Sequence, residues 1–263
     1  MVNMLKIFCL LTLIAPAAWG QPAPPLINPV GPPAQVAPDP AVDPVLDALN
    51  TRGKNLQDFT GDVVLTESDA ITGAETQRIG KVWFQRLPNG DARIRVSFDR
   101  KKLSNKELKQ RIEYKLENGK LIDQNFDTKL QVTRQVLKPG QKLDPLKLGE
   151  GPFPLPIGQD REEVLKNFNV KKIAPAKDDP AGTTHLSLKP LAGTRFARKF
   201  SSIDVFVGSD QFPARIETVD KDGVSVRTTD LTNIKINTGL KDADFSLPEP
   251  GKDWGVRDEG LGE

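Results

Sequence analysis

Alternation of apolar and polar residues constrains what this chain can fold into more than any other feature. From Ile94 to Phe98 every second residue is apolar, and the residues between them are Arg or Ser. That pattern is typical of a strand with one buried face and one face in water. Less regular strand patterns occupy residues 59–65, 80–86, 112–116, 121–126, 130–136, 184–188, 202–207, 214–219 and 224–229.

Turn signals separate several of these strands. Gly90, Gly119 and Gly223 each follow an Asn or Asp, and such pairs accept the positive φ that tight hairpin turns require. Many short strands joined by turns predict one antiparallel sheet.

Two helices are predicted beside the sheet. The first begins at Asp43, which can cap it, with Pro44 at its first position and Gly53 ending it in a left-handed turn. The second begins near Asp160 and runs to Phe168, with its apolar residues on one face.

Two further segments interrupt the strand pattern. Residues 104–111 are charged, and we expect either a short helix or a loop insertion there. Residues 151–158 form an apolar loop stiffened by three prolines. The apolar residues of this loop and of the helix after it need an apolar surface to pack against. We expect that surface to be the open face of the sheet. A curved sheet of this kind either fills its concave side with side chains or keeps a cavity for a ligand.

The amino terminus has the parts of a secretory signal. Lys6 precedes an apolar run over residues 7–14, and the small residues Ala18 and Gly20 precede Gln21. The run is too short to span a bilayer, which takes about 20 residues. We therefore expect residues 1–20 to be a cleavable signal peptide rather than an uncleaved anchor.

Residues 21–42 are expected to form an extended linker, because eight of them are proline. This linker is either a spacer or peptide ligand, or a leader with no specific role. The only cysteine, Cys9, lies within the signal, and Gln21 stands where a lipoprotein signal needs a cysteine. The mature chain is thus expected to have no disulfide and no lipid anchor of its own.

The residues do not form a catalytic constellation. His185 is the only histidine and lies in a strand pattern without a nucleophile motif beside it, so a structural role is favoured over a general base. A single Cys and a single His do not make a zinc site, and no phosphate-binding glycine loop occurs. The 37 Lys and Arg are interspersed with 35 Asp and Glu, which argues against a nucleic-acid partner. We expect a protein that is not an enzyme and carries no metal or cofactor.

Arg86 is the one charged residue with a functional interpretation. By strand parity it shares a side with Val82 and Phe84, and a cation on an apolar face is costly unless it is paired. It is either a gate that bonds to carbonyls of a lid or a strand-end arginine that reaches water.

Three motifs together resemble the LolA-like outer-membrane lipoprotein carrier family. Residues 80–88 read Gly-Lys-Val-Trp-Phe-Gln-Arg-Leu-Pro, similar to the family's strand "G-x-L-W-x-x-R-P". Residues 203–223 resemble its strand, proline turn, strand and Asp-Gly hairpin. Residues 231–237 and 244–251 resemble its closing strand and "F-x-x-P-x-G" ending. The likeness spans residues 43–256, leaving 257–263 as a tail.

The resemblance implies a mainly β fold, an incomplete and strongly curved antiparallel β-barrel with a helical lid. It implies a periplasmic monomer that shelters the acyl chains of a lipoprotein, or another lipid, between an inner-membrane donor complex and an outer-membrane acceptor. Arg86 matches the family's lid-bonding arginine. The expected cavity residues are Val63, Leu65, Val82, Phe84, Ile94, Val96 and Phe98, with Phe153, Leu155 and Ile157 as lid elements.

Two departures from the family's pattern put the cargo and the partner proteins in question. The chain has Asn89 and Gly90 where the family's archetype has an apolar aromatic residue, and the proline-rich loop at residues 151–158 also differs. The alternative functions are an envelope-stress regulatory module that senses lipid or lipoprotein, a lipid-anchored acceptor and a hydrolase. An ordinary filled core would explain the same apolar residues.

Overall fold

The structure is a computed structural model that describes residues 39–104, 106–138, 141–142, 146, 158 and 160–261. Its helical elements are α1 (Asp43–Lys54), α2 (Arg161–Asn167) and the short 3-10 helix η1 (Asp242–Phe245). Its strands are β1 (Asp58–Asp69), β2 (Glu75–Arg86), β3 (Ala92–Leu103), β4 (Lys106–Glu117), β5 (Lys120–Asn125), β6 (Leu130–Gln135), β7 (Phe168–Ile173), β8 (Thr184–Pro190), β9 (Phe200–Val207), β10 (Pro213–Asp220), β11 (Ser225–Ile236) and β12 (Gly255–Glu259).

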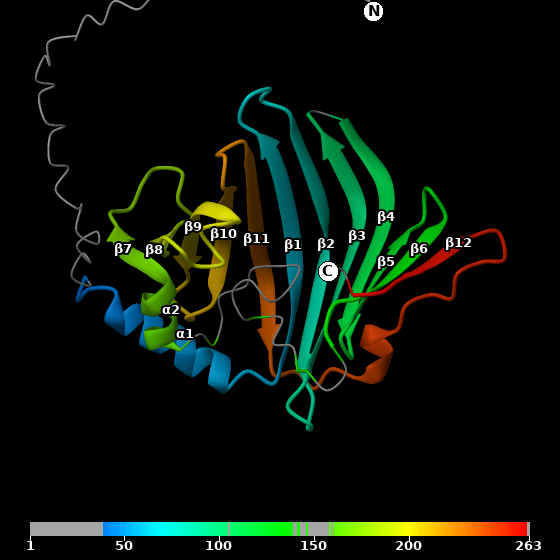
Figure 1. Cartoon of the computed structure of the whole chain (residues 1–263), viewed down its shortest axis with the longest axis horizontal. Coiled ribbons are helices and arrows are strands. Elements are labelled where there is room, and N and C mark those ends of the chain that lie inside the picture. The colour runs from blue at the N-terminus through cyan, green and yellow to red at the C-terminus, as the bar shows by residue number, and fades with distance from the viewer. Residues whose placement is uncertain are drawn as a thin grey trace, which may run out of the picture. The chain divides into compact units, whose positions relative to one another are not determined.

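All of these strands lie in one open, curved sheet (Figure 1). Their order is β12-β6-β5-β4-β3-β2-β1-β11-β10-β9-β8-β7. Neighbours run antiparallel except β12, which pairs with β6 in parallel. The prediction of a mainly β fold built on a curved antiparallel sheet is therefore confirmed.

The hairpin turns fall where the sequence places them. Gly90, Gly119 and Gly223 all have positive φ, and Asn118 shares the left-handed region with Gly119. These turns set the register of the hairpins on either side, and the register decides which side chains share a face.

Register shifts bend the sheet, because a bulge adds local twist. One lies between Ile79 and Gly80 of β2, opposite Phe98 and Arg100 of β3. There a Cβ on Gly80 would lie 1.9 Å from the carbonyl oxygen of Ser97. Only glycine allows the two backbones to approach this closely.

The concave side of the sheet, here called the inner face, carries the main hydrophobic core. Side chains from β1–β3 and from β7–β11 belong to one buried cluster, together with Leu46 and Leu49 of α1 and Val164 of α2. The two helices thus pack against the apolar side of the sheet. Leu146 is also part of this cluster.

The opposite side, here called the outer face, is covered in part by the chain after β11. Phe245 of η1 is fully buried, and the guanidinium of Arg93 lies 4.2 Å from the centre of its ring. Arg93 also bonds to Asp242 at 2.6 Å. A cation stacked on an aromatic ring and paired with a carboxylate holds η1 on the sheet.

Asn237 and Asp58 fasten the end of β11 to the start of β1. The Asn237 side chain accepts hydrogen bonds from the backbone N–H groups of Gln57 and Asp58. In return, the Asp58 carboxylate accepts from the backbone of Thr238 and Gly239. The asparagine in the closing motif of the sequence therefore has a structural task, since it satisfies backbone donors that would otherwise be unpaired.

Several sequence predictions at element boundaries were wrong. Residues 106–111 belong to β4 and not to a helix or loop, because Leu108 faces inward between outward-facing charged residues. Phe168 begins β7 instead of ending the second helix. Val42, not Asp43, occupies the cap position of α1, and Gly53 lies within the helix.

The ends of the domain also differ from the expected boundaries. Val42, the last residue of the expected linker, is only 1% exposed and belongs to the core. β12 continues to Glu259, so residues 257–259 of the expected tail are part of the sheet. The second difference arises because β12 pairs with β6, which is distant in sequence. The second helix does begin near Asp160 as predicted, and Asp160 caps it by accepting from the N–H groups of Glu162 and Glu163.

Gly80→Ala is expected to destabilise the protein by about 1–3 kcal/mol, the usual effect of forcing atoms into a packed site. Gly260→Ala is the matched control, since a Cβ there would meet nothing within 4 Å. Urea unfolding followed by circular dichroism measures the difference. Equal unfolding midpoints for the two variants would contradict the close approach of β2 and β3.

Candidate functional site

The seven expected cavity residues all lie on the inner face. Cross-strand pairing places Val82 opposite Val96 and Phe84 opposite Ile94, while alternation along β1 puts Val63 and Leu65 on the same side. Six of the seven are at most 3% exposed, and Leu65 is half-buried. They form a continuous apolar surface, here called the floor.

Contacts between aromatic rings connect the floor to the β9–β10 turn. Phe59 of β1 stacks on Phe84 at 5.4 Å between ring centres and meets the edge of Phe212 at 5.1 Å. Phe212 lies just before β10, so this trio joins the central strands to the β9–β10 turn. Offset and edge contacts of this kind add to the area that the rings bury.

Sequence reasoning named floor residues only from β1, β2 and β3. The structure adds an equally apolar inner face on the other half of the sheet, and a strand alternation in residues 202–207 was the signal that could have identified it. The added residues are Phe168, Val170, Leu186, Leu188, Ile203, Val205, Val207, Ile216 and Leu231. The expected lid elements Phe153, Leu155 and Ile157 lie outside the described residues.

Arg86 lies where β2 meets the helical side of the fold. Its guanidinium carbon is 5.8 Å from the centre of the Phe84 ring. A Cβ built on Gly158 would be 3.6 Å from Arg86 Nη2, and the Gly158 N–H donates to the carbonyl of Leu49 in α1. Arg86 is thus at the junction of the floor, α1 and the backbone at Gly158.

The floor becomes polar toward β5. Tyr114 of β4 lies opposite Val96, and Asp123 of β5 lies opposite Tyr114. Burial raises the pKa of the Tyr114 hydroxyl, and the charge of Asp123 adds to this effect. Burial also raises the pKa of the Asp123 carboxyl, against the lowering effect of Arg134 and Arg78. Sequence reasoning did not single out either residue.

His185 lies on the outer face, away from the floor. Its Nε2 is 2.8 Å from Asp204 and its Nδ1 is 3.7 Å from Asp179. The ring stacks on Phe206 at 4.2 Å between ring centres. These contacts tie the loop before β8 to β9, which is the structural role that the sequence favours.

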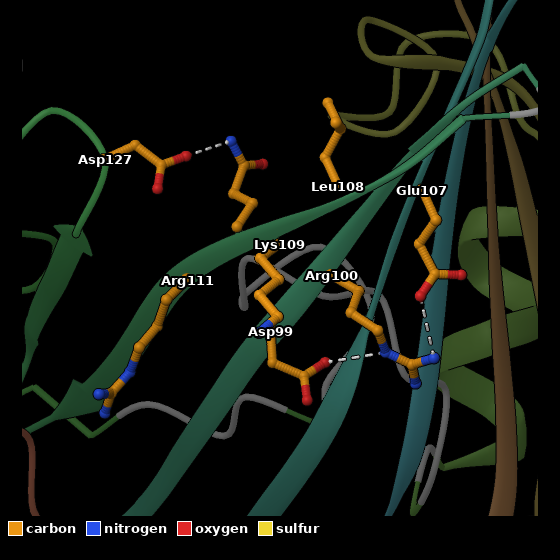
Figure 2. Close-up of a pocket in the computed structure, with 8 residues that line it drawn as sticks. Asp99, Arg100, Glu107, Leu108, Lys109, Arg111 and Asp127 are labelled. Atoms are coloured by element: carbon orange, nitrogen blue, oxygen red, sulfur yellow. Dashed lines mark hydrogen bonds and ion pairs between the residues drawn. The ribbon is translucent and has the colours of Figure 1, made fainter.

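A hollow of about 610 Å³ lies where the ends of β3 and β4 meet the β5–β6 turn (Figure 2). Arg100 bonds there to both Asp99 and Glu107, and Gln110 bonds to Asp127. Seven of its eight lining residues are charged or polar, and none of them belongs to the floor. Its lining is Asp99, Arg100, Glu107, Leu108, Lys109, Gln110, Arg111 and Asp127.

The His, Cys, Asp and Glu side chains of the described residues include no group of three or more that could hold a metal ion. None of the helices in this part of the chain has both the length and the apolarity needed to cross a membrane.

Comparison with known proteins gives similarity in structure but not in sequence. No family model matches the chain, and no curated protein sequence matches it. Sixty-eight solved chains are similar. One is an uncharacterized conserved protein from Thermus thermophilus, with a TM-score of 0.47 and 13% identity over 83% of this chain and 99% of that one.

Two other similar structures have descriptions that bear on lipoproteins. Mycobacterium tuberculosis lipoprotein LppX has a TM-score of 0.44 and 12% identity over 77% of this chain and 98% of its own. A domain from Vibrio parahaemolyticus attributed to outer membrane lipoprotein sorting has a TM-score of 0.37 and 11% identity over 77% of this chain and 95% of its own. Similarity of fold at such identities does not carry function from one protein to another.

Proposed function

We propose that this chain is an exported, non-enzymatic carrier that shelters the acyl chains of a lipoprotein or another lipid on the floor. The observation that carries the proposal is the largely apolar surface on one side of a single open sheet. The secretory pattern of residues 1–20 and the three LolA-like motifs support it. In this proposal the protein is a periplasmic monomer that takes its cargo from an inner-membrane donor and delivers it to an outer-membrane acceptor.

The energetics favour such a role. Each methylene removed from water contributes about 0.8 kcal/mol, so a long acyl chain needs a sheltered surface to cross an aqueous compartment. The floor is lined by branched and aromatic side chains without buried polar groups between them, which suits an alkyl chain. Release remains possible because such contacts are non-directional.

Loading requires the floor to be uncovered, since six of the expected cavity residues are at most 3% exposed. The polar contacts between the two helices are weak. Arg161 lies 3.2 Å from Asp43 and 3.6 Å from Asp47, and all three side chains are more than a third exposed. Exposed pairs of this kind contribute at most about 1 kcal/mol each, so apolar packing rather than charge pairing holds the two helices in place. We propose that Arg86, beside Gly158, helps to hold this junction closed.

Purified mature protein is expected to release an acyl lipid or lipoprotein when it is extracted with organic solvent and the extract is analysed by mass spectrometry. It is also expected to bind a fluorescent fatty-acid analogue. A protein that neither co-purifies with an acylated molecule nor binds the analogue would contradict the carrier function.

Leu65→Gln is expected to weaken binding of the fatty-acid analogue roughly tenfold, because a half-buried apolar contact of the floor is lost. Val64→Gln is the matched control, since Val64 is the neighbouring half-buried residue on the outer face. Fluorescence titration gives both dissociation constants. Equal weakening in the two variants would show that the inner face is not where the chain binds.

Arg86→Leu is expected to speed release of the bound analogue about tenfold, as the loss of one charged hydrogen bond would do. Arg86→Lys keeps the charge without the planar fork and should give an intermediate rate. Lys81→Leu, on the same strand but 63% exposed, is the control. Stopped-flow displacement measures the rates. If Arg86→Leu releases the analogue at the wild-type rate, Arg86 has no gating role and is only an arginine at the end of a strand.

A further inference from the structure

Asp123 occupies an unusual position for a carboxylate. Its neighbours across the strands are Tyr114 and Val132, and alternation along β5 places Leu121 next to it on the same face. Leu121 and Tyr114 both pack against the hydrophobic core, and Val132 is 7% exposed. The carboxylate is therefore a charged position within a mostly apolar row across the sheet.

The carboxylate is poorly matched by the protein. In the described part of the chain, no group donates a hydrogen bond to it, and its ion pair with Arg134 spans 3.8 Å, beyond hydrogen-bond range. Arg134 is instead directed to Glu259 of β12, at 2.7 Å. The other arginine near it, Arg78, is paired with Glu67. Burying part of a carboxylate without a donor is costly, and burial raises its pKa accordingly.

Among the described residues, Asp123 lacks a hydrogen-bond donor and not an acceptor. The guanidinium groups near it make their closer contacts with other carboxylates, Arg78 with Glu67 and Arg134 with Glu259. An ammonium group offers three donors and a positive charge. It would match this position better than an anion or an uncharged head.

The position also fits the geometry of the floor. Val96, Tyr114 and Asp123 stand side by side on three neighbouring strands, so Asp123 is about 10 Å from Val96 at a strand spacing of about 4.8 Å. An alkyl chain that lies on the floor can thus extend across the sheet and place its head group beside Asp123.

We infer that Asp123, with Tyr114 beside it, receives the ammonium group of an amphiphile whose chain lies on the floor. This inference rests on the proposed carrier function and gives its cargo an orientation. The same chemistry has two sources, the amine of a lipid head group or the free amino terminus of an acylated polypeptide. An uncharged amphiphile would bind by its chain alone.

The test compares matched pairs of probes on wild-type protein. Dodecylamine is paired with N-dodecylacetamide, which has the same chain without the charge, and each competes with the bound fluorescent fatty-acid analogue. Wild type is expected to prefer the amine roughly tenfold, the effect of one charge-assisted hydrogen bond. Asp123→Asn should abolish the preference and leave acetamide binding unchanged. Glu107→Gln, which removes an exposed carboxylate from the outer side of β4, should keep it.

Thermal unfolding separates a binding role from a structural one. Because the pKa of Asp123 is raised on folding, its ionised form destabilises the fold above that pKa. Asp123→Asn at neutral pH should therefore leave the unfolding midpoint unchanged or raise it. A clearly lower midpoint would make Asp123 a structural residue and overturn the inference.

Two further pairs distinguish the sources. One is an acylated peptide with a free or an acetylated amino terminus, and the other is a short-chain phosphatidylethanolamine with a free or an acetylated amine. A preference for the free amine within either pair supports the inference and names the source. Equal binding within all pairs overturns the inference but leaves the carrier function intact, and no binding of any probe overturns both.

Discussion

The apolar inner face of the sheet must be covered, and the rest of the structure follows from that requirement. All strands of the described chain belong to one sheet, so a second sheet does not provide the cover. The helices α1 and α2 and the side chain of Leu146 join the same buried cluster instead. A cover made of short, separate pieces can leave the sheet more easily than a second sheet could, because each piece buries less apolar area. The outer face needs no such cover, since its charged side chains pair with one another and with the segment around η1.

Local patterns in the sequence predict the central strands well. The alternation in residues 94–98 and the Asn118-Gly119 turn specify both a strand face and a register, and the structure agrees with each. The patterns fail where distant contacts decide the structure. Residues 106–111 look helical because five of the six are charged or polar, yet pairing with β3 makes them a strand. β12 pairs with β6, which is distant in sequence, and no local sequence pattern predicts this pairing.

The residues of the candidate site also fall into those that the sequence predicts and those that it does not. Parity alone places Val82, Phe84 and Val96 on one face, and Arg86 at the end of that face. Asp123 could not be recognised, because polar residues on both faces of β5 hide its direction. Only the register of β4 with β5 shows that it continues the row from Val96 and Tyr114. The unusual position of Asp123 can be recognised only from the structure, which also shows that no described residue donates a hydrogen bond to its carboxylate.

The central claim is that an acyl chain binds along the inner face, and photo-crosslinking tests it most directly. A fatty acid with a diazirine in its chain would be bound to the protein and irradiated, and mass spectrometry of the digest would locate the attachment sites. The account predicts attachment to inner-face residues such as Val82, Val96 and Phe98. Attachment confined to outer-face residues, or spread equally over both faces, would contradict it.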